Sequence, residues 1–425
     1  MQRSAKFVRY LREFGYEPVV VTGPGAAADQ RWTPRDDSLT DDVSPDTVVR
    51  RLPTMPSGSV GARRRLERWT PLRSAFERWW VEGLVETGRD AGRGVDVVYA
   101  SMSPFETAEA AAQLSRALGV PWVADLRDPW ALDEMTIFPT VAHRLAEKRR
   151  MRRALSSAAA IVMNTREAAR AVVEAFPELS TRLAEPIPNG YDAADFAGPT
   201  AARASSLFRI VHTGYLHTEH GLRHREASPL RRALEGTTPG VDFLTRSHVY
   251  LLEGLAALLA RRPELQSRME VVLAGVLSPA DENVVQRFAH HELVRTPGYV
   301  PHRATVELIR TADLLFLPMH DLPAGGRARI VPGKTYEYLA SGRPILAAVP
   351  DGDARDLLGA FDQVTLCRPA NASAIAAAIE AALLAGRDDN ASAVPAGAER
   401  FERRQQTRTL AQTFDSVLSA SRSSF

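Results

Sequence analysis

The sequence of 425 residues contains a single cysteine, Cys367, and this scarcity limits the chemistry available to the chain. One cysteine can form neither an intrachain disulfide nor a cysteine-based metal cluster, and it fits a reducing compartment. Apolar runs are also short, and none reaches the roughly 18 residues that a membrane-spanning helix needs. Residues 1–17 are amphipathic and charged throughout, which is not typical of a secretory signal. These features predict a cytoplasmic protein.

The chain also carries little net charge. The 53 basic residues nearly balance the 51 acidic ones, so the formal net charge is +2. This balance gives no overall attraction to nucleic acid, and nucleic acid is not an expected partner. Basic residues do gather with aromatics over 63–80, and a second basic run occupies 148–153. Such stretches suit contact with an anionic membrane surface, although solvated helix faces and core aromatics are the commoner explanation.

Short β-branched runs alternate with longer helical patterns along most of the chain, which is typical of a parallel, doubly wound α/β sheet. The predicted strands are 18–22, 95–100, 121–125, 160–163, 208–212, 270–274, 314–317 and 344–349. The predicted helices include 107–118, 142–155, 248–259, 335–341 and 400–420. The alternation breaks at 188–192 and continues after the small residues of 197–206, which predict a linker.

We therefore expect an α/β protein with two Rossmann-like domains. The N-terminal domain is predicted to span 1–196 and the C-terminal domain 207–396. A helix within 397–425 has no strand after it, and we expect it to cross back to the N-terminal domain.

The start of the chain differs from an ordinary doubly wound domain. Such a domain usually opens with a strand and a glycine-rich turn, whereas Phe7, Leu11 and Phe14 already follow helical spacing. The first strand of the N-terminal domain is therefore expected to be missing. We interpret this as a start placed late relative to similar proteins. A natural protein whose other parts cover the gap is the alternative.

The stretch 331–344 carries the first functional signal. Pro332 and Gly333 are expected to end a loop, and a helix is expected to begin at Lys334 or Thr335. Backbone N–H groups at such a start, with Lys334 beside them, suit a diphosphate. Glu337 follows one turn later, where a carboxylate can accept hydrogen bonds from two ribose hydroxyls. A solvated Glu and Lys at a helix start are the plain alternative.

This stretch resembles the C-terminal signature of glycosyltransferase family 4, a retaining family with the GT-B fold. Glu337 falls on the second glutamate of the family's E-x7-E pattern, which binds the nucleotide ribose, and residues 341–345 match the tail after it. Arg329 replaces the first glutamate, so the resemblance does not specify the donor sugar. Five more segments match in the same order: 188–192, 211–216, 272–275, 297–300 and 311–318.

The resemblance also assigns residues around the donor. Gly214 falls in a strand-then-glycine turn where the backbone approaches the diphosphate, and Gly298 and Tyr299 fall in the loop near the nucleotide base. Arg246 falls on the lysine of a basic clamp that neutralises the leaving diphosphate. Lys334 is expected to act with it.

In the N-terminal domain, the resemblance places Arg127 and Asp128 on a His-Asp pair whose histidine touches the donor sugar and diphosphate. An ion-pair network of Asp125, Arg127 and Asp128 that shapes the loop is the alternative. Ser101 and Ser103 are predicted to cap the helix that follows them, or to line the cleft.

The resemblance implies transfer of a sugar, hexosyl or deoxysugar, from a nucleoside diphosphate donor to an acceptor hydroxyl, with retention of configuration. The reaction would occur between two domains that face each other across a cleft. The acceptor is expected to be a small molecule, a glycan or a lipid-linked molecule, the last with peripheral contact at the inner face of the membrane. No cofactor or metal is expected, since His, Asp and Glu do not cluster at metal spacing. A non-catalytic nucleotide-sugar-binding protein and a sugar-nucleotide epimerase of the same fold are the alternatives.

Overall fold

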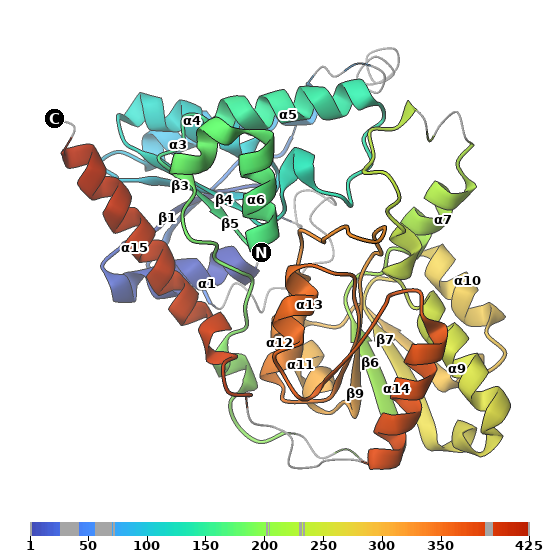
Figure 1. Cartoon of the computed structure of the whole chain (residues 1–425). Helices are drawn as coiled ribbons and strands as arrows, with labels where there is room; N and C mark the ends of the chain where they lie inside the picture. The colour runs from blue at the N-terminus through green and yellow to red at the C-terminus, as the bar shows by residue number, and fades with distance from the viewer. Residues whose placement is uncertain are drawn as a thin grey trace. The chain divides into compact units, whose positions relative to one another are not determined.

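The computed structural model describes residues 2–25, 42–55, 70, 73–200, 203, 205–228, 232, 234–386 and 394–423. Positions 63–69, 71 and 72 of the first basic stretch, and 201, 202 and 204 of the expected linker, lie outside the described residues. The chain divides into two compact units (Figure 1). The first comprises Met1–Asn189, Leu234–Thr237 and Arg403–Phe425, and the second comprises Gly190–Ala233 and Thr238–Glu402.

The first unit contains two parallel sheets. Strand β1 (Val19–Thr22) pairs with β2 (Val48–Arg51) in one sheet. In the other, β4 (Trp122–Leu126) lies between β3 (Val98–Met102) and β5 (Ala160–Met163). Every residue of β4 and β5 is buried, as their continuous apolar runs predict for strands covered on both faces.

Helices cover both faces of the three-stranded sheet. They are α1 (Gln2–Leu11), α4 (Thr107–Leu118), α5 (Val141–Leu155), α6 (Arg166–Ala175) and α15 (Arg403–Arg422), with short 3-10 turns η1 (Arg12–Phe14), η4 (Trp130–Leu132) and η5 (Pro177–Arg182). Helix α3 (Ala75–Ala91) packs against α4 and the two-stranded sheet. Alternate strand residues point to opposite faces. Val123 and Val162 pack with α1 and α15, whereas Ala124 and Ile161 pack with α4, α5 and α6.

The second unit is built on one six-stranded parallel sheet. Its strands are β6 (Phe208–Thr213), β7 (Met269–Ala274), β8 (Val294–Gly298), β9 (Leu314–Pro318), β10 (Ile345–Ala348) and β11 (Val364–Cys367). They are ordered β11-β10-β9-β6-β7-β8, the doubly wound order in which the chain reverses direction across the sheet between β6 and β9.

The helices of the second unit surround this sheet. They are α7 (Thr218–Glu226), α9 (Val249–Arg261), α10 (Pro279–Arg287), α11 (His302–Arg310), α12 (Lys334–Ala340), α13 (Asp353–Leu358) and α14 (Ala372–Ala385), with 3-10 turns η6 (Ala193–Phe196), η7 (Phe243–Thr245), η8 (Pro263–Arg268), η9 (His291–Leu293) and η10 (Glu399–Phe401). Apolar side chains of α9 and α14 form one core cluster with β6, β7 and β9. Within the described ranges, no helix is both long and apolar enough to cross a membrane.

The predicted elements correspond to observed ones within a few residues, and the strand 160–163 and the helix 107–118 match without a shift. Three of the described strands were not predicted, namely β2, β8 and β11. Each lies at the edge of a sheet and is at least partly exposed, so its sequence lacks the continuous apolar run of a central strand.

The predicted cap of α4 is wrong. Glu106 occupies the N-cap position, and its side chain makes no capping hydrogen bond. Ser101 lies in β3, where its hydroxyl is 3.1 Å from that of Ser4. Ser103 precedes the N-cap by three residues, too early to cap the helix.

Candidate functional site

The turn after β6 lies at the point where the sheet order reverses. Strand β6 ends at Thr213 and pairs with β7 on one side and β9 on the other. Open α/β sheets bind ligands outside the carboxyl ends of their strands at such a point. Gly214 follows with φ of 92°, in the left-handed region that favours glycine. The N–H of Gly214 donates to the carbonyl of Ala274 (2.7 Å), so this amide is already bonded within the protein. What Gly214 offers a ligand is the space left by its missing side chain.

Helix α12 is attached to this strand end by two side chains one turn apart. The Tyr338 hydroxyl accepts a hydrogen bond from the Thr213 N–H (2.9 Å), and Lys334 Nζ lies 3.1 Å from His212 Nε2. A Cβ atom added to Gly214 would lie 3.2 Å from Lys334 Nζ. The structure therefore brings the predicted residues Gly214 and Lys334 together, and the missing side chain leaves room for the ammonium group.

The start of α12 agrees with the sequence prediction. The helix begins at Lys334, with Gly333 at its N-cap and exposed to solvent. Thr335 is fully buried, and its N–H donates to the carbonyl of Pro332 (3.0 Å). Glu337 lies one turn into the helix and is half-buried. Gly333 and Glu337 are therefore within reach of a ligand, whereas the Thr335 side chain is not.

Arg246 is positioned by the long segment between β6 and α9. Its carbonyl accepts a hydrogen bond from the N–H of His217, just before α7 (3.0 Å). Helix α7 approaches η7 so closely that a Cβ atom on Gly221 would lie 2.5 Å from the Cα of Leu244. Glycine at 221 permits this approach. The packing of α7 on η7 thereby fixes the backbone of Arg246 beside the turn that follows β6.

The electric field at this site disfavours positive charge on Lys334 when no ligand is bound. Burial and the neighbouring Arg246 lower the pKa of Lys334 to about 7, and Glu337 opposes the change. Burial and Arg246 also lower the pKa of His217 to about 2. Burial, with Lys334 nearby, lowers the pKa of His212 well below its usual value. An anion placed here would restore the charge of the lysine.

A row of glycines extends the site along the sheet edge. A Cβ atom on Gly275, after β7, would lie 2.5 Å from the carbonyl oxygen of Gly214. The N–H of Gly275 in turn donates to the carbonyl of Gly298, at the end of β8 (2.9 Å). Tyr299 follows Gly298 and is exposed. Arg329 lies half-buried on the loop before α12.

In the first unit, Arg127 and Asp128 follow the end of β4. Arg127 Nε donates to the carbonyl of Met102, at the end of β3 (3.0 Å). Asp125 is buried and accepts two hydrogen bonds from Arg3, at 2.8 and 2.9 Å. The alternative prediction, an ion-pair network of Asp125, Arg127 and Asp128, is therefore wrong for Asp125. Asp125 pairs with Arg3 of α1, because α1 packs on that face of the sheet.

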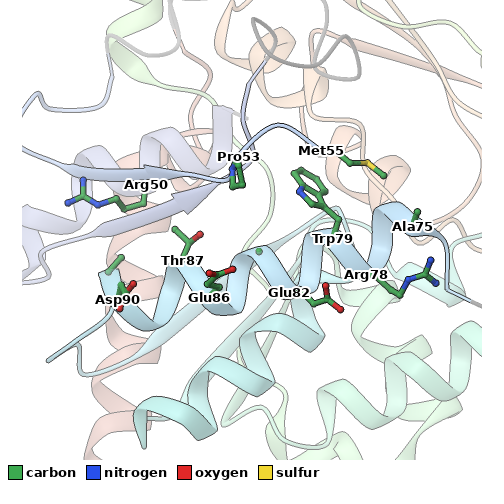
Figure 2. Close-up of a pocket in the computed structure, with 12 residues that line it drawn as sticks. Arg50, Pro53, Met55, Ala75, Arg78, Trp79, Glu82, Glu86, Thr87 and Asp90 are labelled. Atoms are coloured by element: carbon green, nitrogen blue, oxygen red, sulfur yellow. The ribbon is translucent and has the colours of Figure 1, made fainter. Parts of the chain in front are cut away.

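A cavity of about 800 Å³ lies elsewhere in the first unit, beside α3 (Figure 2). Its described lining includes Pro53, Met55 and Trp79 together with carboxylates of α3, and none of the predicted site residues. Trp79 also packs against Phe76 and Trp80. These aromatic side chains belong to a local core, in agreement with the plainer of the two explanations given for the basic and aromatic stretch.

Sequence comparison assigns both units. Residues 2–190 match the family model described as a glycosyl transferase 4-like domain, and residues 241–384 match the model of glycosyl transferases group 1. The chain belongs to the glycosyltransferase 4-like family. A comparison with curated proteins finds no match.

Solved structures show the fold of this glycosyltransferase. Anabaena Alr3699/HepE in complex with UDP and glucose is similar over 97% of this chain and 95% of that chain, with 15% identity and a TM-score of 0.60. A sucrose-phosphate synthase from Thermosynechococcus elongatus is similar over 98% and 92%, with 16% identity and a TM-score of 0.65. A glycosyltransferase from Rickettsia africae is similar over 98% and 94%, with 12% identity and a TM-score of 0.61. The predicted GT-B fold is confirmed.

Sequence reasoning did not single out three residues of this glycosyltransferase that surround the predicted site. His212 and His217 flank the turn at Gly214, and Tyr338 joins α12 to the end of β6. One signal was available for His212, a polar residue near the end of a strand and close to a glycine turn. The described residues contain no group of three or more His, Cys, Asp or Glu arranged to hold a metal ion.

Proposed function

We propose that the chain transfers a sugar from a nucleoside diphosphate donor to an acceptor hydroxyl, with retention of configuration and without a metal ion. The observation that carries this proposal is the placement of Lys334 and Arg246 at the Gly214 turn. Burial and the neighbouring Arg246 lower the pKa of Lys334 to about 7, so a bound anion is needed to keep Lys334 fully charged at neutral pH. A diphosphate at the carboxyl end of β6 meets this need.

The same two cations suit the proposed chemical step. Cleavage of the bond between sugar and phosphate leaves negative charge on the diphosphate, and cations held beside it stabilise the transition state. The forked guanidinium of Arg246 can contact two phosphate oxygens, and Lys334 adds a compact charge. In the retaining reaction the acceptor hydroxyl attacks from the face that the diphosphate leaves. Its proton then passes to a diphosphate oxygen.

Other residues of the second unit are proposed to hold the remainder of the donor. Glu337 accepts hydrogen bonds from the ribose hydroxyls, since it lies one turn beyond Lys334 on the same helix. The further donor contacts in this proposal are Gly298, Tyr299, Arg329, Gly333 and the backbone of Thr335. In the first unit, Arg127 and Asp128 are proposed to contact the donor sugar.

The acceptor is proposed to be a small molecule, a glycan or a lipid-linked molecule. The basic run of α5 supports contact with an anionic membrane. The support is modest, because neighbouring carboxylates neutralise part of the positive charge. Arg150 pairs with Glu147, and Arg152 pairs with Glu178. Co-sedimentation with vesicles of anionic and of neutral lipids tests this part of the proposal, and equal sedimentation with both would reject it.

Incubation with a panel of UDP-, dTDP- and GDP-sugars tests the activity. UDP-glucose is the first choice, since one of the similar proteins was solved in complex with UDP and glucose. Sugar transfer, or slow donor hydrolysis without an acceptor, is the expected result, and NMR of the anomeric product reports retention. An isomerised donor would indicate an epimerase instead. Binding without turnover would indicate a non-catalytic sugar-nucleotide-binding protein.

A further inference from the structure

His212 is a buried polar residue near the carboxyl end of β6. Its side chain is 1% exposed, at the last position but one of β6. Burial of an imidazole is unfavourable unless both ring nitrogens find partners. Nδ1 lies 3.0 Å from the carbonyl oxygen of Phe316, on the neighbouring strand β9, and Nε2 lies 3.1 Å from Lys334 Nζ.

These two contacts fix the proton on the ring. A carbonyl oxygen can only accept, so Nδ1 must carry the hydrogen and donate it to Phe316. Burial keeps the ring neutral, because it lowers the pKa of His212 well below the usual value. Nε2 is then a lone-pair acceptor, and Lys334 must be the donor of the second hydrogen bond.

We propose that His212 is a positioning residue, which holds the Lys334 ammonium at the Gly214 turn, where the donor diphosphate is to bind. The inference rests on the proposed function and adds a residue to its machinery. Without this hydrogen bond, the flexible lysine stem would let the ammonium move away from the like charge of Arg246 and toward the carboxylate of Glu337.

The chemical type of the acceptor matters to this role. The groups that face Lys334 are Arg246, Glu337, His212 and, before α7, His217. A carboxylate in place of His212 would also hold the ammonium, but it would cancel the charge that the ligand needs. A neutral imidazole orients the ammonium and leaves its charge for the diphosphate.

Lys334 can be observed directly, because the sequence contains only three lysines, Lys6, Lys148 and Lys334. Protein labelled with ¹³C-lysine gives few enough signals for NMR titration, and Lys334→Arg assigns the signal of interest. In His212→Phe, which keeps a ring but has no acceptor, the released ammonium moves from Arg246 and its pKa rises by about one unit or more. In His212→Gln, whose amide oxygen can take the place of Nε2, the pKa stays near that of the unaltered protein.

Ligand binding provides a second measurement. The dissociation constants of UDP, dTDP and GDP are measured by calorimetry, and His212→Phe is expected to weaken the best of them about tenfold, with His212→Gln restoring most of the loss. His248→Phe is the matched control, because His248 is equally buried and bonds to the Asp281 carbonyl instead of Lys334 (3.2 Å). It should change neither the titration of Lys334 nor nucleotide binding.

Two results would overturn the proposal. One is a Lys334 pKa in His212→Phe that is unchanged or lower, which would mean that the lysine keeps its place without the imidazole. The other is equal loss of binding in His212→Phe and His248→Phe, which would indicate general destabilisation. The NMR titration needs no ligand. Failure of every nucleotide to bind the unaltered protein would therefore count against the proposed function and leave the positioning role to be decided separately.

Discussion

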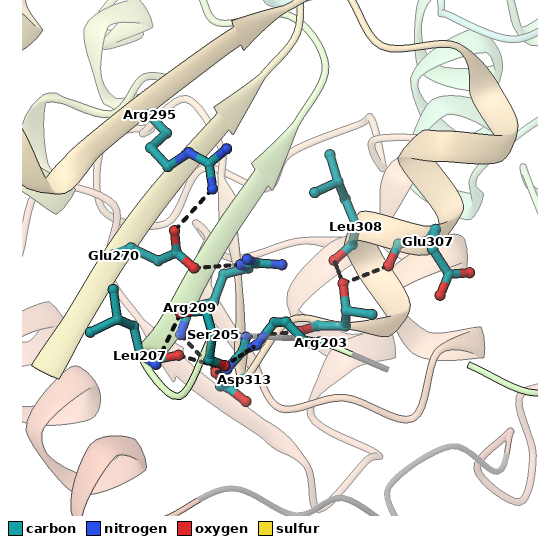
Figure 3. A network of polar contacts seen from close by, with 10 residues as sticks. Arg203, Ser205, Leu207, Arg209, Glu270, Arg295, Glu307, Leu308 and Asp313 are labelled. Atoms are coloured by element: carbon teal, nitrogen blue, oxygen red, sulfur yellow. Dashed lines mark hydrogen bonds and ion pairs between the residues drawn. The ribbon is translucent and has the colours of Figure 1, made fainter. Parts of the chain in front are cut away.

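The two ends of the six-stranded sheet treat positive charge in opposite ways. At the amino ends of the strands, a network of arginines forms ion pairs with carboxylates (Figure 3). Arg203 donates to Asp313 (2.8 Å), just before β9, and Arg209 of β6 and Arg295 of β8 share Glu270 of β7. Here the chain neutralises its own charges, and the pairs fasten neighbouring strands.

At the carboxyl end the arrangement is different. Lys334 donates to the neutral imidazole of His212, and burial together with the charge of Arg246 lowers the pKa of Lys334 to about 7. Glu337 offsets this effect only in part, whereas Arg203 is paired directly with Asp313. The difference teaches that the amino end serves folding, while the carboxyl end retains an unfavourable field that an anionic ligand can relieve.

Breaking the amino end should have the largest effect on folding. Arg203→Met removes a guanidinium that is 5% exposed and leaves Asp313 buried without its cation. We expect the free energy of unfolding to fall by about 3–5 kcal/mol, with unchanged activity per folded molecule. Urea titration and initial rates measure the two quantities. Arg295→Met is the control, since Arg295 is 65% exposed and Glu270 keeps Arg209, so its effect should stay within about 1 kcal/mol.

Breaking the carboxyl end should have the reverse outcome. Lys334→Met removes one of the charges that stabilise the leaving diphosphate, so kcat/KM should fall about 10²–10³-fold. Stability should fall by less than in Arg203→Met, because loss of the like charge near Arg246 offsets the hydrogen bond that the buried His212 loses. Lys148→Met, on α5, is the control with unchanged kinetics. A loss of stability as large as that of Arg203→Met would show that the two ends do not differ in the way described.

Arg246→Ala sharpens the comparison within the carboxyl end. The negative charge of the diphosphate grows toward the transition state, so the variant should lose about tenfold to a hundredfold in kcat and less in donor KM. Steady-state kinetics separate the two parameters. If KM alone rises, Arg246 binds the ground state and the transition state equally, and its part in catalysis is disproved.

Glu337→Gln changes an acid at the same end. Loss of charged hydrogen bonds to the ribose should weaken donor binding by about 1.5–3 kcal/mol, while the fold persists because Glu337 is only half-buried. Calorimetry with the preferred donor measures the change, and circular dichroism checks the fold. Unchanged affinity would remove Glu337 from the donor site.

The local parts of this site could be predicted from the sequence, whereas the contacts between distant strands could not. The helix start at Lys334 and the turn at Gly214 follow from neighbouring residues whose spacing is visible in the chain. The link between His212 and Lys334 spans 122 residues, and that between Arg203 and Asp313 spans 110. Such contacts depend on β6 lying beside β9, and spacing along the chain does not specify the order of strands in a sheet.

The pH dependence of the free energy of unfolding tests the environment of the histidines at the carboxyl end of the sheet. It is the smallest effect that we predict. Burial and Arg246 lower the pKa of His217 from 6.5 to about 2 in the folded protein, and His212 shifts in the same direction. Below about pH 6.5 the unfolded chain binds protons that the folded chain refuses, so each such histidine lowers stability as the pH falls. Above that pH both states are neutral at these positions, and the histidines add no pH dependence.

His217→Gln isolates one of these contributions. Between pH 6 and pH 5, the variant should lose less stability than the unaltered protein, by about 1.4 kcal/mol per pH unit, measured by urea unfolding at each pH. His291→Gln, at an exposed position on η9, serves as the control and should leave the slope unchanged. If His217→Gln keeps the slope of the unaltered protein, burial and the field of Arg246 do not lower the pKa of His217 as described. The carboxyl end would then lack the electrostatic tension that distinguishes it from the neutralised amino end.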